Sequence, residues 1–423
     1  MAAAFAHAPG ATIPSVPHRH GSDLARAQRA ARLIVGQLPW GSSDQPDPRV
    51  WHTLGQGLTQ CDPLADQLVD WMQAHGTRTA WALVNQAIDQ GLAAVPDAPA
   101  PLRAFFMQVE HRPDWVNDDL LIEGARVCGL GGRAGMRALA VTGLMAGYQL
   151  AAVNQTLLAT GALEKGAARR IAETTKWWID VTEPGAMARS GDGFKSTLRV
   201  RIIHAMVRQH VAAQPSWDFA DLGQPVNQTD MQATYLGFST VYLLGMRLVG
   251  VPLTRRDKAA VMHLWRYIAW VNGVDPAFLH ELQDGERSGM FLLHQNLLTQ
   301  RMADTDSARL AQALADEPLH RHYGRFGWLK GHVNRAMTLS LARACMGNET
   351  LRDLGLPVWN LPWYPLGMIA FNQALHRAAR LLPGGRSWLM RRGRAQQRDY
   401  LPVLFGQQAP ALRDVGAVKV AAH

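Results

Sequence analysis

The chain has 423 residues, of which 48% are hydrophobic, and a formal net charge of +9. This length and apolar content allow a large packed core and exclude a globally disordered protein. A positive charge would suit nucleic acid or an anionic membrane surface. However, no nucleic-acid recognition motif occurs, and no basic stripe carries interleaved aromatic residues. We therefore predict that the protein does not bind nucleic acid.

The three cysteines, Cys61, Cys128 and Cys345, lie far apart in the sequence. Their odd number and wide spacing match neither a disulfide framework nor a zinc or iron–sulfur site. The first 22 residues lack the basic start and the continuous apolar stretch of an export signal. We expect residues 1–22 to form a disordered leader and the protein to be cytoplasmic. No stretch of eighteen uninterrupted apolar residues occurs, so the sequence predicts no membrane span.

Helical periodicity dominates the chain, whereas the alternation typical of strands is scarce and no repeat of fixed period is visible. The pattern predicts helices over residues 23–38, 63–74, 77–93, 118–129, 136–160, 164–181, 196–213, 230–249, 255–272, 276–303, 306–315, 328–346 and 365–382. A basic segment follows the last of these helices. We predict an all-α fold that forms one large helical domain with extra helices at both ends.

Two patterns that often mark cofactor or metal sites have simpler explanations in this chain. Residues 129–134, GLGGRA, match the glycine pattern of dinucleotide-binding folds, but no strand precedes them. We predict a loop between helices at this position. The His-x-His pairs at 18–20 and 320–322 lie in the leader and at the end of a helix, so neither predicts a metal site.

The segment at residues 195–210, KSTLRVRIIHAMVRQH, places a histidine within an apolar helix face. With 3.6 residues per turn, His204 falls in the middle of a stripe formed by Val200, Ile203, Val207 and Val211. Arg201 and Arg208 flank that stripe. The segment alone favours a core histidine whose ring N–H is satisfied by a carbonyl, with a metal or cofactor ligand as the alternative.

A second segment thirty positions upstream, RRIAETTKWWID at residues 169–180, places Arg170 and Thr174 on one helix face with Trp177, Trp178 and Val181. A buried arginine requires an anionic or polar partner. One explanation is a carboxylate such as Asp180, Glu183 or Glu123, with the Thr174 hydroxyl bonded back to its own helix. The other is the polar edge of a bound ligand. The residues leave both open.

Together these segments resemble the haem-dependent oxygenases that include the rubber oxygenases, or latex clearing proteins, and the fungal MpaB oxygenases. The resemblance spans about residues 105–280. The matching residues are HRPDW at 111–115, Arg170, Thr174, KWW at 176–178, Val181, Pro184, Gly185, RVR at 199–201, His204, Ala205, Val207, Arg208, PVNQ at 225–228, Asp230, His263, Trp265 and Arg266.

The resemblance implies a globin-like core that holds one haem b, with His204 as the proximal iron ligand. It also implies that Arg170 and Thr174 lie near the haem, and we include Arg201 among the cofactor-binding residues. Rubber oxygenases carry a lysine directly before the matched threonine, where this chain has Glu173. A carboxylate at that position would act as a catalytic base or face solvent.

The expected function is a haem-dependent oxygenase that uses dioxygen to oxidise or cleave a carbon–carbon double bond of an apolar, isoprenoid or lipid-like substrate. The alternatives are a haem-binding sensor or carrier without turnover and a helical lipid-binding module without haem. The expected organisation is an N-terminal extension at 23–104, the haem-oxygenase core at 105–280, C-terminal helices at 281–400 and a tail at 401–423. The basic segment after residue 383 would pack on the core or lie on a membrane surface.

Overall fold

The computed structural model describes residues 15–35, 38, 43–161 and 167–406, and within these ranges the chain folds into helices without a β-strand. The α-helices are α1 Leu24–Val35, α2 Pro48–Gly57, α3 Pro63–Ala74, α4 Thr77–Gln90, α5 Ala100–Glu110, α6 Asp118–Gly129, α7 Gly132–Ala138, α8 Ala151–Ala159, α9 Ala167–Val181, α10 Asp192–Ala212, α11 Phe219–Leu222, α12 Gln228–Phe238, α13 Thr240–Leu248, α14 Arg255–Val271, α15 Gly285–Thr299, α16 Thr305–Asp316, α17 Gly327–Cys345, α18 Asn348–Asp353, α19 Trp363–Arg380, α20 Gly385–Arg398 and α21 Leu401–Phe405. Short 3₁₀ turns lie at η1 Leu92–Ala94, η3 Pro276–Phe278 and η4 Glu317–His320, and a π-helical stretch, η2 Leu139–Met145, follows α7.

Several helices begin at side chains that satisfy the free backbone N–H groups of the first turn. Asn117 caps α6, and Asp62 caps α3 directly before Pro63. Thr254 and Asp257 form a reciprocal capping box at the start of α14. Such caps stabilise a helix by about 1 kcal/mol each, and they explain why these boundaries agree with the sequence pattern.

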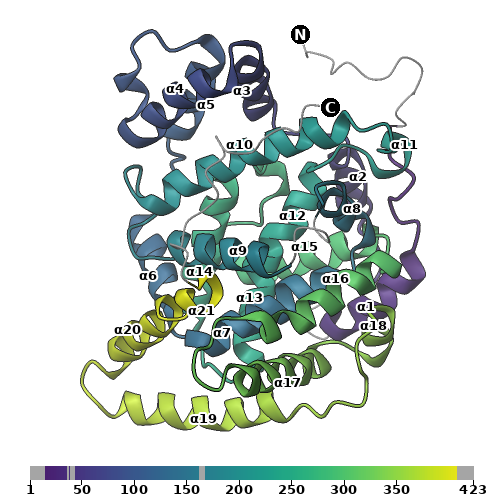
Figure 1. Ribbon diagram of the computed structural model, residues 1–423, viewed down its shortest axis with the longest axis vertical. Coiled ribbons are helices and arrows are strands. Elements are labelled where there is room, and N and C mark those ends of the chain that lie inside the picture. The colour runs from purple at the N-terminus through teal and green to yellow at the C-terminus, as the bar shows by residue number, and fades with distance from the viewer. Residues whose placement is uncertain (1–14, 36–37, 39–42, 162–166, 407–423) are drawn as a thin grey trace.

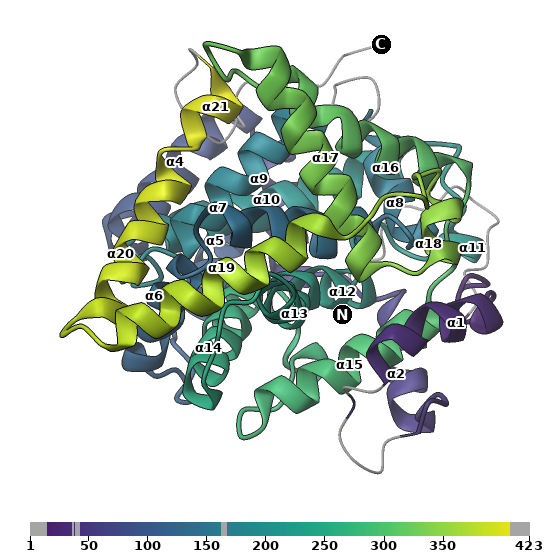
Figure 2. The same cartoon turned by 90° about the horizontal axis from the view of Figure 1, so that it is seen from below.

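The helix α10 runs through the middle of the molecule, with α9 beside it and α3 packed on its other side (Figure 1). The helices α6 and α14 pack closely behind them. Gly124 of α6 permits this approach, because a Cβ atom at that position would lie 2.4 Å from the carbonyl oxygen of Ala260 in α14. The C-terminal helices α17 and α19 cover the lower face (Figures 1 and 2).

One hydrophobic core connects nearly the whole described chain, since it includes residues from Ala65 in α3 to Leu401 in α21. A smaller cluster around Leu54 and Phe278 joins α2, α12 and η3. The prediction of an all-α fold is confirmed. The division of the chain at residues 104, 280 and 400 stays a prediction. Of the helices that the structure describes, none combines the length and hydropathy that crossing a bilayer requires.

The predicted helices at 136–160 and 230–249 are each divided in the structure. The first becomes α7, the π-helical η2, a turn and α8. The second breaks at Ser239, whose backbone leaves the helical region and whose hydroxyl donates to the carbonyl of Tyr235 at 2.9 Å. The apolar pattern continues through both breaks because the residues on either side are buried. At Ser239 the preceding residues Tyr235 and Leu236 enter the smaller cluster, and the following residues Tyr242 and Leu243 enter the large core.

The described part of the N-terminal leader, residues 15–22, is packed against the core, which differs from the expected disorder. The backbone N–H groups of His18 and Arg19 donate to the carbonyls of Ala220 and Asp221 at 3.0 Å. The Arg19 side chain is 2% exposed and forms a 2.7 Å ion pair with Asp230 of α12. Residues 1–14 lie outside the described residues.

The glycine-rich segment at 129–134 forms the corner between α6 and α7, as predicted, and α20 packs directly against it. Gly393 of α20 lies so close that a Cβ atom there would be 2.0 Å from the carbonyl oxygen of Gly129. These glycines therefore serve a close contact between helices.

Candidate functional site

The His204 side chain lies deep within the protein on the predicted apolar stripe of α10. Its Nδ1 atom is buried and has no hydrogen-bond partner in the described structure. Burial lowers the pKa of His204 to about 4, so the ring is neutral at pH 7. The ring nevertheless keeps accessible surface, as do Val200, Ile203 and Val207 on the same stripe. We infer from this accessible surface that the stripe borders an internal space, and no carbonyl of the described residues satisfies Nδ1 of the imidazole.

The two arginines that flank His204 form buried ion pairs with α3. Arg201 contacts Asp62 through Nε at 2.6 Å and Nη2 at 2.9 Å, and it also donates to Gln108 at 2.8 Å. Although burial alone would raise the pKa of Asp62, Arg201 brings it below the usual value. These contacts use the donors of Arg201 within the protein. They favour a structural role for Arg201 in place of the predicted contact with a cofactor.

The second pair joins Arg208 Nη1 to Asp66 Oδ1 at 2.8 Å. Here burial outweighs the nearby guanidinium and raises the pKa of Asp66 to about 7. Gly273 adjoins the first pair, and a Cβ atom there would lie 2.3 Å from Asp62 Oδ2. Together the two pairs fix the rotation of α10 about its axis and thereby set the direction in which the stripe faces.

Arg170 and Thr174 lie on α9, which packs against α10. The Arg170 guanidinium donates to the hydroxyl of Tyr148, while its Nη1 atom is buried without a partner. No carboxylate pairs with Arg170 in the described structure, so the proposed partners Asp180, Glu183 and Glu123 are not found there. The Thr174 hydroxyl makes no hydrogen bond with the described residues, including its own helix. Both side chains retain donors for a bound group.

Glu173 forms an ion pair along the surface of α9, with 2.9 Å between its Oε1 and Arg169 Nε. The Arg169 side chain is 58% exposed. Of the two roles considered for this carboxylate, the ion pair favours the surface position. A catalytic role of Glu173 stays a prediction that the structure does not support.

Aromatic side chains of three helices form one wall next to Thr174. Phe238 of α12 stacks on Trp265 of α14 with 5.1 Å between ring centroids, and Trp177 of α9 packs edge-on against both. Gly237 directly precedes Phe238, and a Cβ atom there would meet no other atom within 4 Å. This half-buried helix position therefore has open space beside it, next to the aromatic wall.

Two distant parts of the resemblance meet at α14. The backbone N–H of Asn117 donates to His263 Nε2 at 3.0 Å, and the Trp115 ring packs edge-on against His263. Arg266 lies over the Trp115 ring at 5.0 Å, and its Nε and Nη1 atoms are buried without partners. Burial lowers the pKa of Arg266. The sequence pattern included Arg266 but assigned no function to it.

Tyr148 is a second residue whose function the sequence analysis missed. It is 1% exposed, and burial raises the pKa of its hydroxyl. The sequence signal is the interruption of the apolar stretch 138–153 by Tyr148 and Gln149. In the structure, the Tyr148 hydroxyl accepts a hydrogen bond from Arg170 and thereby positions its guanidinium.

The side chains around this interior space fit a haem group. Haem needs one neutral imidazole for its iron, an apolar and aromatic enclosure, and cationic or polar partners for its two carboxylates. His204 supplies an unpaired neutral ring, and Arg170 and Arg266 each keep buried N–H donors without partners. The described residues contain no group of three or more His, Cys, Asp or Glu side chains arranged to hold a metal ion.

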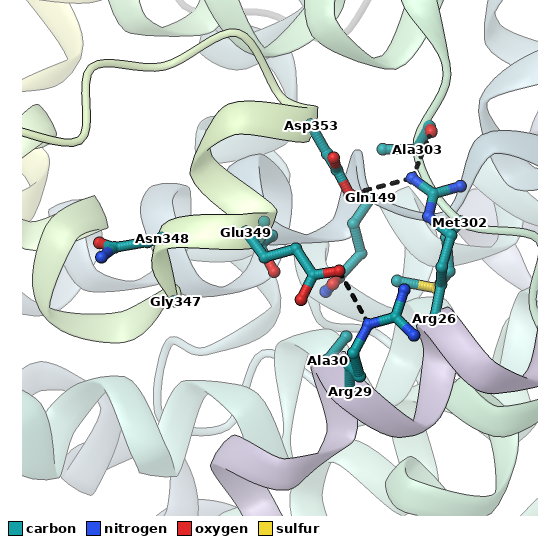
Figure 3. A pocket seen from close by; sticks show the side chains of 11 residues that line it. Arg26, Arg29, Ala30, Gln149, Met302, Ala303, Gly347, Asn348, Glu349 and Asp353 are labelled. Carbon is teal, nitrogen blue, oxygen red and sulfur yellow. Dashed lines mark hydrogen bonds and ion pairs between the residues drawn. The ribbon is translucent and has the colours of Figure 1, made fainter.

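Two cavities that the structure also contains do not include His204 in their lining. The smaller, about 220 Å³, lies between α1, the start of α18 and the segment at 302–303 (Figure 3). Its charges pair across it, since Arg26 contacts Asp353 at 2.9 Å and Arg29 contacts Glu349 at 2.8 Å. This pocket therefore joins the first helix to the C-terminal part of the chain, with no charge left for a ligand. The larger cavity is described below.

Comparison with known proteins agrees with the resemblance seen in the sequence. Residues 123–381 match the family model described as the catalytic domain of ER-bound oxygenase mpaB/B'/rubber oxygenase. A rubber oxygenase from Streptomyces sp. (strain K30) is 25% identical over 227 residues, which cover 52% of this chain and 54% of that protein. The chain thus spans about half the length of this curated relative.

The fold is similar to that of the latex clearing protein LCP in its closed state. The superposition has a TM-score of 0.59 at 20% sequence identity and covers 82% of this chain and 91% of that protein. The family model matches more than half of the chain and includes α9, α10, α12 and α14, which carry the site. The chain therefore belongs to the family of the mpaB/B' and rubber oxygenase catalytic domains.

Proposed function

We propose that this protein is a haem b-dependent oxygenase that uses dioxygen to oxidise or cleave a carbon–carbon double bond of an apolar, isoprenoid or lipid-like substrate. The observation that carries the proposal is the neutral, unpaired imidazole of His204 beside an internal space. Membership of the oxygenase family supports it. A core histidine with only a packing role would have a partner for its buried ring nitrogen.

In this proposal His204 holds the iron, and bound haem supplies the redox chemistry with dioxygen. Arg170 and Thr174 would donate hydrogen bonds to a propionate or to an anionic oxygen at this site. Tyr148 keeps the Arg170 guanidinium in place through its hydroxyl. The wall of Trp177, Phe238 and Trp265 excludes water and orients an apolar chain.

The first experiment replaces the proposed iron ligand. We expect His204→Ala to lose the Soret band and the haem measured as pyridine haemochrome. His210→Ala is the matched control, because His210 lies on the same helix and is exposed. Full haem content and oxygen uptake in His204→Ala would contradict the assignment.

The second experiment separates an oxygenase from a haem-binding sensor or carrier. The oxygenase consumes oxygen when an isoprenoid alkene is added, and its saturated analogue produces no uptake. A sensor or carrier binds haem but consumes no oxygen with either compound. A protein without any Soret absorbance after haem reconstitution would contradict both functions and leave a lipid-binding module.

We also propose that the face formed by α17, α19 and the turn before α20 contacts a membrane surface (Figure 2). Large apolar side chains are exposed along this face: Trp328 72%, Trp359 80%, Leu361 73%, Leu366 62%, Leu381 84% and Leu382 66%. Tryptophan and arginine side chains suit the interface between headgroups and acyl chains. The basic helix α20 also packs on the core through Leu389 and Met390, which is the first of the two interpretations that the sequence left open for this segment.

Vesicle sedimentation tests this contact. We expect the protein to sediment with vesicles that contain phosphatidylglycerol, and Leu381→Glu combined with Leu382→Glu to abolish it. Leu282→Glu is the control, because Leu282 is 46% exposed outside this face. Equal sedimentation of all variants would contradict the proposal.

A further inference from the structure

A cavity of about 730 Å³ lies between the helices of the central core and the C-terminal helices. It is lined by residues of α7, η2 and α9 on one side and of α17, α19, α20 and α21 on the other. We call it the α7–α19 cavity. Figure 2 shows α19 crossing the face under which α7 and α9 lie. Its volume is within the range of roughly 300–1,000 Å³ that is typical of small-molecule sites.

The inner wall of the α7–α19 cavity is apolar. Val141, Met145, Ile171, Leu314 and Leu389 are buried and line it. Because this wall offers no polar partners, it suits a hydrocarbon chain better than ordered water.

The charges around the cavity have one sign. Its lining includes Arg133, Arg137, Arg321, Lys330 and Arg392 and contains no aspartate or glutamate. Arg321 is neutralised by Glu317, with contacts of 2.5 to 2.9 Å. The other four cations form no ion pair in the described structure. The site therefore has an excess of positive charge beside an apolar wall.

Arg137 is the best placed of these cations. It extends from α7 and donates to the hydroxyl of Tyr364 in α19 at 2.6 Å and to the side-chain oxygen of Asn334 in α17. Its guanidinium also lies 4.8 Å from the centre of the Tyr364 ring. These partners are neutral, so they hold the guanidinium in position without compensating its charge. A half-buried, fixed and uncompensated arginine is suited to bind an anion.

We propose that the α7–α19 cavity binds an amphipathic anion, whose carboxylate or phosphate contacts Arg137 and whose hydrocarbon chain lies along the apolar wall. Arg133, Lys330 and Arg392 are exposed at the margin and add to the attraction of an anionic head. His376, which is 6% exposed, also lines the cavity, and burial lowers its pKa.

This site is distinct from the proposed haem site and does not depend on it. Ile171 and Thr175 line the cavity from α9, about 100° around the helix from Arg170 and Thr174. The protein can therefore be tested without haem. Loss of haem binding in His204→Ala leaves this proposal unaffected, so the two proposals fail separately.

The experiment measures binding of laurate to the full chain by isothermal titration calorimetry, with dodecanol as the neutral analogue of equal chain length. We expect one laurate to bind per chain, at least tenfold more tightly than dodecanol. Arg137→Gln should weaken laurate binding at least tenfold, and Ala140→Trp, which fills the cavity, should abolish it. Arg78→Gln is the control, because Arg78 is an exposed arginine on α4 outside the cavity.

The second arm distinguishes a free acid from a membrane lipid. Vesicles of phosphatidylglycerol and of phosphatidylcholine are compared with the native chain and with Ala140→Trp. Laurate binding that Ala140→Trp abolishes assigns the site to free acids. Phosphatidylglycerol-selective binding that Ala140→Trp abolishes, without laurate binding, assigns it to a lipid headgroup and chain.

Three results would overturn the proposal: equal affinity for laurate and dodecanol, laurate binding that persists in Ala140→Trp, or no binding in either arm. Thermal unfolding monitored by circular dichroism identifies a variant that fails to fold. If Arg137→Gln does not fold, Arg392→Gln is measured in its place. Laurate affinity is then also measured at several salt concentrations, and an affinity that does not change with salt contradicts the contact between laurate and a cation.

Discussion

Replacement of Arg201 by methionine tests the structural role that the contacts give to this residue. Arg201 and Asp62 are 2% and 5% exposed, and their two contacts of 2.6 and 2.9 Å lie within the core. Arg201→Met leaves the Asp62 carboxylate buried without its partner. Removing one member of a buried pair costs about 3–5 kcal/mol in the free energy of unfolding.

Urea unfolding followed by circular dichroism measures this change. Arg199→Met is the matched control on the same helix, because the Arg199 pair with Asp89 is 3.2 Å long and its carboxylate is 48% exposed. An exposed pair of this kind contributes about 0.2–1 kcal/mol. The double variant Arg201→Met with Asp62→Leu should recover the lost stability except for about 1 kcal/mol from the α3 cap, since no unpaired carboxylate remains buried at this position.

The haem content of each folded molecule distinguishes the two roles of Arg201. We expect Arg201→Met to bind as much haem per folded chain as the native protein. Equal destabilisation by Arg201→Met and Arg199→Met would refute the reasoning on the buried pair. Loss of haem without loss of stability would instead support the prediction that Arg201 contacts the cofactor.

Three further predictions concern the interior space. Thr174→Val should change the free energy of unfolding by less than about 1 kcal/mol, because the hydroxyl has no protein partner. Substrate-dependent oxygen uptake should fall at least tenfold in this variant, and unchanged uptake would argue against a catalytic hydroxyl. Gly237→Ala should stabilise the protein by about 0.5–1 kcal/mol, since its Cβ meets no atom within 4 Å. The larger side chain of Gly237→Leu should lower the haem content, and full haem content in that variant would place the haem elsewhere. In the haem-free protein, burial lowers the pKa of His204 and His263 to about 4 and that of His280 to about 3. For these three histidines the unfolded chain binds protons first, so the free energy of unfolding should fall as the pH drops from 6.5 towards 4, although Asp66, whose pKa burial raises to about 7, opposes part of this fall. A flat profile in urea titrations of Asp66→Asn over this range would contradict the histidine shifts.

The sequence pattern predicted the elements that depend on local signals. Residues 118–129 form α6 as predicted, with Asn117 as its cap, and α14 begins at the expected residue 255. The stripe around His204 also follows from helical periodicity. The break at Ser239 was not predicted, because its hydrogen bond to Tyr235 depends on the packed backbone geometry of α12 and α13.

The partners of the predicted site residues could not be predicted from the sequence. Asp62 and Arg201 are 139 residues apart, and Arg170 of α9 contacts Tyr148, which lies in the turn before α8. A helix face shows that an arginine requires a partner, but only the tertiary packing determines which residue provides it. For this reason the pattern placed Arg201 at the cofactor, whereas the structure pairs it with α3.

The ion pair between Arg19 and Asp230 has a consequence for the order in which the protein is built. Its two members are separated by 211 residues, so the segment around Arg19 obtains its partner only after residue 230 has been synthesised. Until then Arg19 remains hydrated, and Asp230 in the first turn of α12 lacks its ion-pair partner. Deletion of residues 1–22 would leave Asp230 without its cation. We expect such a chain to give a lower yield of folded protein, even though it still contains every helix from α1 onward.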